Sequence, residues 1–212
     1  PGLTLAKFEK LNITDLLAEG ESNFAGSSSS RIHNITVSAA RYNGLLVPPG
    51  KVFSFNELLG EVSAKSGYLP ELVIKNKKIV PEYGGGICQV SSTLYKTALK
   101  AGLDIVERRG HSVTIRYYSP QGLDATIYPG VVDLKFKNDT DEYILIQSKI
   151  PKIPHDKAYD SYAKNFLSFK GDVRINHMEN FVKNKSLVKG FYHKALTMIM
   201  LCRWERNHFN NI

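Results

Sequence analysis

Cysteine, tryptophan and long apolar runs are the scarcest features of this 212-residue chain. Its 2 cysteines are too few for a disulfide scaffold or a four-thiolate zinc site. No apolar run reaches the ~18 residues that a membrane-spanning helix needs. There is no Gly-x-y repeat, and a hydrophobic fraction of 42% is too high for a disordered chain. The absences leave a globular chain, long enough for one domain with extra elements or for two small domains.

The start of the chain lacks a methionine and a basic-then-apolar leader, and its first residue is Pro1. We therefore expect a processed chain or a fragment whose signal or anchor is missing. Residues 1–14 are then the remnant of a preceding segment. A membrane would be reached only through an anchor absent from this chain.

Positive charge is concentrated in residues 151–212, which hold 11 Lys+Arg and 5 Asp+Glu. Residues 1–150 hold 17 Lys+Arg and 15 Asp+Glu, so this body is nearly neutral. A basic appendage on a neutral body does not indicate nucleic-acid binding, despite a formal net charge of +8 for the chain. The apolar residues of the appendage show no clean periodicity. We expect a domain at 15–150 and a basic C-terminal tail of unknown role at 151–212.

The body has helical patterns near its front and short β-type runs behind them. Ser30 is positioned to cap a helix over residues 31–43, and a second helix is expected over 88–100. A polar Lys-Asn-Lys segment between two apolar runs predicts a hairpin of strands 71–74 and 78–80. Further strands are expected at 45–47, 52–55, 104–108, 113–118, 125–128, 132–136 and 143–147. This order predicts an α+β domain with a mostly antiparallel sheet of short strands and two or three packed helices.

The segment with the clearest chemistry is a run of three glycines, Gly84-Gly85-Gly86, directly before the second expected helix. Such a run suits a backbone that takes positive φ or passes close to another group. Cys88 falls in the first turn of the helix, where free amides and the positive dipole end favour an anion. A thiolate there has a lowered pKa and is nucleophilic. The same amides could hold the oxyanion of a tetrahedral acyl intermediate.

The second expected helix has an apolar face for the sheet and a polar face that could line a cleft. The polar face carries Cys88 as the candidate nucleophile. The candidate substrate-binding or oxyanion residues are Gly85, Gly86, Gln89, Ser91, Ser92 and Tyr95. Spacing alone leaves an alternative, in which Cys88 is a small buried thiol at the start of a helix that follows a glycine loop.

A thiol nucleophile needs a base or an orienting cation, and the body offers two histidines. His33 lies inside the first expected helix, where a surface or core role is typical. His111 lies in a loop between two expected strands and is the better partner. Asp124 could orient the His111 imidazole as a third member, or it could be a turn residue that bonds its own backbone.

Other chemistries lack their motifs in this sequence. No tight cluster of His, Cys and carboxylates predicts a metal site, and no cofactor is expected. The three glycines do not continue into a Gly-Lys-Ser/Thr phosphate loop, and no Gly-x-Ser-x-Gly elbow is present. Of the chemistries considered, the hypothesis that Cys88 acts as a nucleophile remains.

Five blocks carry a resemblance: RIHNI at 31–35, PGKVFSFN at 49–56, YGGGICQVSSTLY at 83–95, ERRGHS at 107–112 and GLDATI at 122–127. In this order they resemble the VanW family of bacterial cell-envelope proteins. The likeness covers about residues 15–148. Residues 151–212 lie outside it.

The resemblance implies an extracytoplasmic protein of the bacterial cell envelope that acts on peptidoglycan stem peptides. The family is named after an accessory protein of vancomycin-resistance clusters, and some members are understood as L,D-transpeptidases that form 3-3 crosslinks through a cysteine. It implies Cys88 as the nucleophile and His111 as its partner. The alternative is a non-catalytic peptidoglycan-binding or accessory protein in glycopeptide resistance. The oligomeric state is not predicted.

Overall fold

The computed structural model describes residues 11, 13, 15–75, 78–112, 122–150 and 195–202. The chain divides into two compact units, one of residues 1–150 with 195–212 and one of residues 151–194, and all described residues belong to the first. The expected strand at 113–118 and most of the segment 1–14 lie outside the described residues. No helix in the described part is long and apolar enough to span a membrane.

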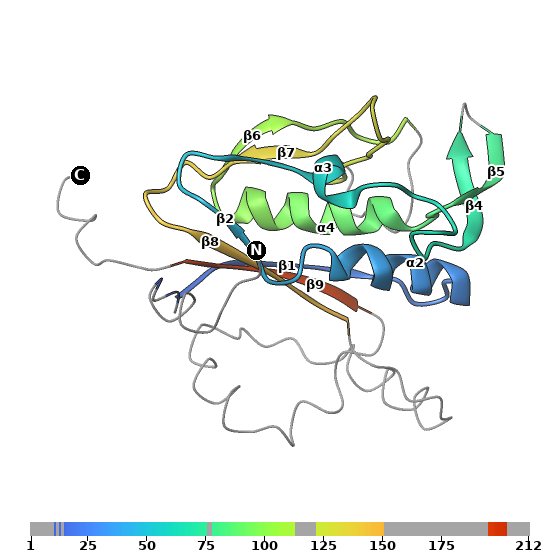
Figure 1. The fold of residues 1–212 in the computed structure, drawn as a ribbon, viewed down its shortest axis with the longest axis horizontal. Coiled ribbons are helices and arrows are strands. Elements are labelled where there is room, and N and C mark those ends of the chain that lie inside the picture. The colour runs from blue at the N-terminus through green and yellow to red at the C-terminus, as the bar shows by residue number, and fades with distance from the viewer. Residues whose placement is uncertain are drawn as a thin grey trace, which may run out of the picture. The chain divides into compact units, whose positions relative to one another are not determined.

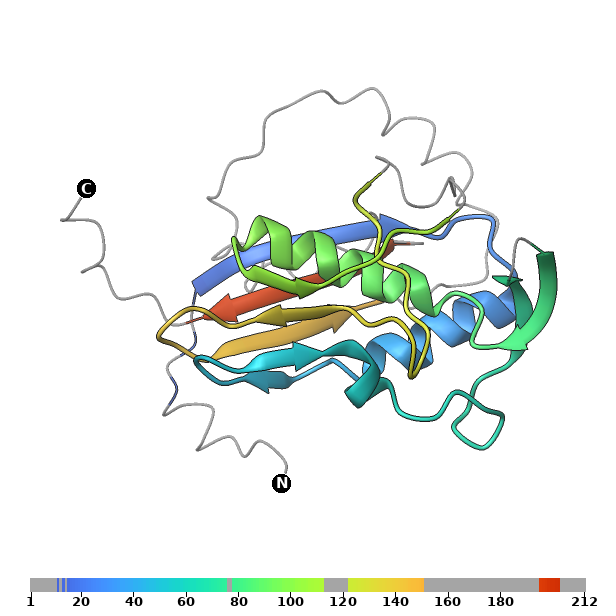
Figure 2. The same cartoon turned by 90° about the horizontal axis from the view of Figure 1, so that it is seen from above.

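The larger sheet has four antiparallel strands in the order β1-β9-β8-β2 (Figures 1 and 2). Its strands are β1 (Asp15–Asn23), β9 (Ala195–Cys202), β8 (Ile144–Lys149) and β2 (Leu45–Val47). The 45–47 strand is confirmed, and the one expected at 143–147 is confirmed with shifted ends. β1 was not expected, and it forms one edge of the sheet.

Strand β9 comes from the segment that was expected to be a tail. Residues 151–212 were expected to form a basic C-terminal tail of unknown role, and Ala195–Cys202 of this segment pairs with β1 on one side and β8 on the other. Leu196, Met198 and Met200 are fully buried on one face of β9. Apolar residues on the opposite face, such as Ile199, hide the period-2 alternation that identifies a half-exposed strand.

The other strands of the described ranges form a smaller sheet and a two-stranded ribbon, and their pairs are all antiparallel. The smaller sheet has the order β3-β7-β6, and its strands are β3 (Val52–Ser54), β7 (Lys135–Lys137) and β6 (Asp104–Glu107). The ribbon pairs β4 (Pro70–Lys75) with β5 (Lys78–Tyr83). The ribbon confirms the predicted hairpin. The strand expected at 125–128 was wrong, because this segment makes only two isolated bridges, Arg109↔Thr126 and Tyr128↔Val132.

Among the described residues, three helices accompany these strands: α2 (Ser29–Ala40), α3 (Phe55–Leu59) and α4 (Ile87–Lys100). Ser28, not Ser30, caps α2, since its side-chain oxygen accepts the N–H of Arg31 at 3.2 Å. The short helix α3 was not expected, and it begins where the Ser54 hydroxyl accepts the N–H of Glu57 at 3.1 Å. Figure 1 shows α4 between the larger sheet and the β3-β7-β6 sheet.

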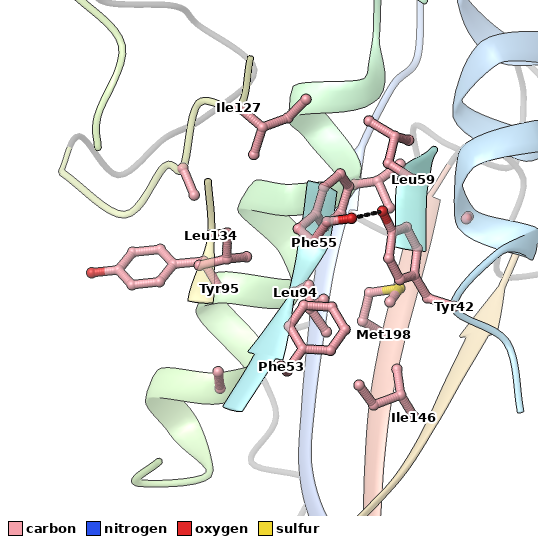
Figure 3. Close-up of a cluster of buried hydrophobic side chains, with 14 of the residues drawn as sticks. Tyr42, Phe53, Phe55, Leu59, Leu94, Tyr95, Ile127, Leu134, Ile146 and Met198 are labelled. Carbon is pink, nitrogen blue, oxygen red and sulfur yellow. Dashed lines mark hydrogen bonds between the residues drawn. The ribbon is translucent and has the colours of Figure 1, made fainter. Parts of the chain in front are cut away.

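The hydrophobic core fills the space between α4 and the two sheets (Figure 3). The rings of Phe53 and Phe136 stack at 4.5 Å across β3 and β7. Tyr42 stacks on Phe55 at 4.5 Å and donates its hydroxyl to the Phe55 carbonyl at 2.9 Å. Leu94 of α4 is fully buried in this cluster. The predicted α+β class is therefore confirmed.

Close packing against β1 fixes the position of α4. A Cβ atom on Gly20 of β1 would lie 2.4 Å from the Thr97 hydroxyl and 3.0 Å from the Thr93 carbonyl oxygen. Only a glycine therefore allows the strand and the helix to approach this closely. This contact lies in the middle and C-terminal part of α4, whereas the glycine loop described next leads into the N-terminal end, which carries Cys88.

Candidate functional site

The three-glycine loop takes the conformation that its composition predicts. Gly84 and Gly86 have φ values of 83° and 113°, a region that other residues rarely adopt. Gly85 is needed for space, because a Cβ there would lie 2.7 Å from the Glu71 Cβ atom. Gly86 also packs closely on α2, where an added Cβ would lie 3.0 Å from the Arg31 Cγ atom. The loop thus connects the β4–β5 ribbon to α4 in direct contact with α2.

Asn34 of α2 anchors this loop from the interior. Its side-chain amide donates to the carbonyl oxygens of Leu69 at 2.9 Å and Gly85 at 3.1 Å, and its side-chain oxygen accepts the N–H of Leu69 at 2.8 Å. Asn34 is fully buried, so these hydrogen bonds are made away from competing water. The RIHNI block therefore contributes a structural clamp on the loop that precedes Cys88.

Cys88 lies in the first turn of α4 and is partly exposed. Its sulfur lies 3.8 Å from the Thr126 hydroxyl oxygen and 3.8 Å from the Ile127 carbonyl oxygen. Burial raises the pKa of the Cys88 thiol, but a hydrogen bond from His111 and the charge of its imidazolium outweigh this effect and lower the pKa below its ordinary value. The site therefore favours a thiolate at Cys88.

His111 connects the thiol to Asp124. Its ring Nδ1 donates to the Asp124 Oδ2 atom at 2.5 Å, and its backbone N–H donates to the same oxygen at 2.7 Å. With Nδ1 engaged, the other ring nitrogen, Nε2, is the one available to Cys88. Burial lowers the pKa of His111, but the hydrogen bond and charge of Cys88, together with those of Asp124, raise it above the ordinary value.

Asp124 is a side-chain partner in this cluster as well as part of a loop. Burial raises the pKa of its carboxyl, but the hydrogen bonds and charge of His111 lower it overall. The carboxylate is therefore ionised at neutral pH and stabilises the imidazolium form of His111. Cys88, His111 and Asp124, which the sequence predicted as a set, lie in one chain of contacts.

The sequence analysis missed Arg108 as a member of the site. Its guanidinium donates to the Asp124 carbonyl oxygen at 2.6 Å, the Gly122 carbonyl oxygen at 2.7 Å and the Asp124 Oδ1 atom at 3.1 Å. The same group lies 5.0 Å from the centroid of the Tyr95 ring, a cation–π distance. The signal in the sequence that could have identified Arg108 as a site residue was its position in the ERRGHS block, three residues before His111.

His33, the weaker candidate for the partner of the thiol, lies elsewhere. It is exposed on α2, and its Nε2 contacts the Gly67 carbonyl oxygen at 2.8 Å. This contact attaches the loop after α3 to α2. The structure therefore places His111, and not His33, beside Cys88.

The polar face of α4 makes interior contacts. The Ser91 hydroxyl donates to the Ala125 carbonyl oxygen at 2.6 Å, and the Ser92 hydroxyl accepts the N–H of Ala125 at 3.0 Å. The Gln89 side-chain amide donates to the Asn23 carbonyl oxygen at 3.0 Å. All three side chains are buried, so they fix the neighbouring backbone instead of bordering an open cleft. Their role in substrate binding stays a prediction, as does that of Tyr95, Gly85 and Gly86.

Two backbone amides in the first turn of α4 are satisfied by carbonyl oxygens of the glycine loop. The N–H groups of Ile87 and Gln89 donate to the carbonyl oxygens of Gly84 at 3.1 Å and Gly86 at 3.0 Å. Within the described part of the chain, the N–H of Cys88 has no backbone acceptor. No group of three or more His, Cys, Asp or Glu side chains in this part could hold a metal ion.

The fold and the site define a class: an α+β domain that carries a Cys–His–Asp cluster at the start of its longest described helix. A family model described as "VanW like protein" matches residues 30–154, which is more than half of the chain. The chain belongs to the VanW-like family, and the resemblance seen in the sequence is confirmed.

Two curated relatives support this assignment. The uncharacterized protein YoaR of Bacillus subtilis (strain 168) is 39% identical over 136 residues, which are 64% of this chain and 45% of that protein. The vancomycin B-type resistance protein VanW of Enterococcus faecalis (strain ATCC 700802 / V583) is 38% identical over 117 residues, 53% of this chain and 42% of that protein. The chain thus spans less than half the length of these relatives. No solved structure matches it.

Proposed function

We propose that this protein is an extracytoplasmic cysteine acyltransferase of the L,D-transpeptidase type, which joins peptidoglycan stem peptides. The contact chain Cys88–His111–Asp124 at the start of α4 is the observation that carries the proposal. The relative named as a vancomycin B-type resistance protein supports a role in the cell envelope. No cofactor is needed for this chemistry, because the nucleophile and the proton donor are side chains of the protein.

Acylation begins from the thiolate of Cys88 and the imidazolium of His111. The thiolate attacks the carbonyl carbon of the peptide bond that precedes the terminal D-amino acid of a donor stem. A C–S bond forms, the C–N bond breaks, and the leaving amine takes the proton from His111. The products are a thioester on Cys88, neutral His111 and a free D-amino acid.

Transfer reverses these roles. An amine of a second stem attacks the thioester, a C–N bond forms, and the C–S bond breaks. His111 takes the proton of the attacking amine, which restores the thiolate and imidazolium pair. Asp124 keeps Nδ1 of the imidazole occupied throughout, so that Nε2 carries the proton in both steps. We assign to the N–H of Cys88 the role of donor to the oxyanion of each tetrahedral intermediate, since this N–H has no backbone acceptor among the described residues.

The direct test is incubation of the full chain with a stem peptide that contains an acceptor amine. Mass spectrometry of the small molecules then follows two products, the released D-amino acid and the crosslinked dimer. We expect both with the native chain and neither with Cys88→Ala. Cys202→Ala is the matched control, since Cys202 is buried in β9 at the far end of the chain's described residues and its pKa is raised by burial. Undiminished product formation by Cys88→Ala would refute the proposal.

A non-catalytic peptidoglycan-binding protein is the second candidate. The burial of Gln89, Ser91 and Ser92 leaves fewer polar groups for substrate than an enzyme of this type was expected to show. If this candidate holds, the chain retains the stem peptide in equilibrium dialysis but releases no D-amino acid. Retention would then be the same for the native chain and for His111→Ala.

A further inference from the structure

The two carboxylate oxygens of Asp124 have different partners. Oδ2 accepts hydrogen bonds from Nδ1 and from the backbone N–H of His111, at 2.5 and 2.7 Å. Oδ1 accepts a hydrogen bond from Nη2 of Arg108 at 3.1 Å. The side chains of Arg108 and Asp124 are 24% and 12% exposed, so water competes only weakly for this contact. Rotation of the carboxylate would therefore break a hydrogen bond to at least one of its two partners.

Arg108 also fixes the backbone of the loop that carries Asp124. Nε donates to the Asp124 carbonyl oxygen at 2.6 Å, and Nη2 donates to the Gly122 carbonyl oxygen at 2.7 Å. The N–H of Thr126 donates to the carbonyl oxygen of Arg109 at 2.8 Å, which pairs the end of this loop with the segment that carries Arg108. Two neighbouring guanidinium nitrogens thus hold the side chain and the backbone of Asp124 at once. The planar fork of arginine donors allows this geometry, whereas the single nitrogen of lysine cannot reproduce it.

Two neighbours keep the guanidinium of Arg108 in this place. The ring of Tyr95, which is 8% exposed on α4, lies 5.0 Å from the guanidinium carbon. Tyr95 follows Cys88 by seven residues, so both residues lie on the same side of α4, two turns apart. Gly110 leaves the necessary space, because a Cβ there would lie 3.2 Å from Nη2 of Arg108 and 3.4 Å from Oδ1 of Asp124. Arg108 therefore rests on the helix that carries the thiol while it holds the carboxylate.

We propose that Arg108 is a positioning residue, which orients the Asp124 carboxylate toward His111 and thereby maintains the ion pair of His111 and Cys88. Its three hydrogen bonds go to Asp124 and Gly122, so it acts on the thiol through Asp124 and His111. The inference deepens the proposed acyl transfer and rests on it, because the thiolate that Arg108 helps to maintain is the proposed nucleophile.

Orientation and charge have opposite effects on the pKa of His111. The positive charge of Arg108 opposes protonation of the ring, so its loss without a change of geometry would raise the pKa of His111. Loss of orientation would lower this pKa, because the carboxylate would no longer accept the hydrogen of Nδ1. The other charged or titratable groups of the described residues that interact with this pair are Lys96 and Cys88 of α4. Both stay unchanged in the variants compared below.

The test uses two pH titrations of the full chain: the nuclear magnetic resonance signal of the His111 ring, assigned with His111→Gln, and the rate of Cys88 alkylation by iodoacetamide. We expect Arg108→Met to lower the pKa of His111 and to move the alkylation profile to higher pH, by about half or more of the shift in Asp124→Asn. The double variant Arg108→Met/Asp124→Asn should shift no further than Asp124→Asn alone, because Arg108 acts through Asp124. Arg109→Met is the matched control, since Arg109 is the exposed neighbouring arginine, and it should keep both native profiles.

Arg108→Lys separates orientation from charge. It keeps the positive charge but cannot make all three hydrogen bonds, so it should move both profiles in the same direction as Arg108→Met. Cys202 reports unfolding in the same alkylation samples, because it is buried in β9 and should stay unlabelled in a folded variant. If Arg108→Met exposes Cys202 to the reagent, Arg108→Lys takes its place in the comparison.

Three results would overturn the proposal: native profiles in either Arg108 variant, a raised pKa of His111 in Arg108→Met, or an additive shift in the double variant. Neither titration contains a stem peptide. Failure here therefore leaves the acyl transfer to its own test, and failure of acyl transfer leaves the role of Arg108 in the ion pair to be decided by these titrations.

Discussion

At the scale of single residues, the charge states of Cys88, His111 and Asp124 depend on one another. The lowered pKa of Cys88 and the raised pKa of His111 arise from the same hydrogen bond, so thiolate and imidazolium stabilise each other. Asp124 adds a negative charge at the far side of the ring. Arg108 holds Asp124 through two hydrogen bonds and the nearby Gly122 carbonyl oxygen through a third. The sequence predicted the first three residues from their types and positions. It did not identify Arg108: the position of this residue in the ERRGHS block was a signal, but its contacts with loop carbonyl oxygens cannot be read from local spacing.

Replacing Asp124 by Asn tests this dependence. Without the carboxylate the pKa of His111 should fall, so the imidazolium loses its proton at lower pH and Cys88 loses its cationic partner. The pKa of Cys88 should then rise toward its ordinary value. The measurement is the rate of Cys88 alkylation by iodoacetamide against pH, with the modified peptide identified by mass spectrometry.

Asp104→Asn is the control for this experiment, because Asp104 is an exposed carboxylate on β6. It should leave the alkylation profile unchanged. An unchanged profile in Asp124→Asn as well would show that Asp124 does not act on the thiol through His111.

At the scale of the elements, the sequence predicted those whose signals are local. Helix α4 follows a glycine loop, α2 shows helical spacing and the ribbon flanks a polar turn, and all three were expected within a few residues of their observed ends. Helix α3 was missed because a strand ends and a helix begins within the single apolar run around Phe55. Gly20 of β1 did not indicate a strand in the sequence, because its role is a tertiary contact with α4 that the neighbouring residues do not reveal.

Gly20→Ala tests the close contact of β1 with α4. The added methyl group would press on the Thr97 side chain and on the helix backbone at Thr93, neither of which can move without disturbing the core. We expect a loss of about 1–3 kcal/mol in the free energy of unfolding, measured by urea denaturation followed by circular dichroism. Glu19→Ala, at the exposed neighbouring position, should change stability by less than about 0.5 kcal/mol. Equal stability of the two variants would contradict the packing described for α4.

At the scale of the molecule, the larger sheet is completed by a strand from the far end of the chain. β9 lies between β1 and β8, so the sheet cannot close until residues 195–202 are present. The sequence could not predict this closure. β9 is separated from β8 by more than 40 residues, and nothing in its local sequence indicates the strands with which it pairs.

A pair of truncated chains tests the role of β9. A chain that ends at residue 194 leaves β1 and β8 without their shared partner and removes the buried Leu196, Met198 and Met200. We expect it to lose cooperative thermal unfolding, because each lost apolar side chain alone costs about 2–5 kcal/mol. A chain that ends at residue 202 keeps all described strands and should unfold cooperatively. Cooperative unfolding of the shorter chain at an unchanged temperature would show that β9 is not part of the stable sheet.

The acyl-transfer account depends most on a covalent bond between substrate and Cys88. Intact-protein mass spectrometry, after rapid acid quenching of the chain with a donor stem peptide that lacks an acceptor amine, detects this bond directly. We predict a mass increase equal to the donor minus its terminal D-amino acid, located on Cys88 by peptide mapping and removed by hydroxylamine. The increase should be absent in Cys88→Ala and present in Cys202→Ala. An unmodified native chain, under conditions in which the stem peptide is bound, would contradict the account.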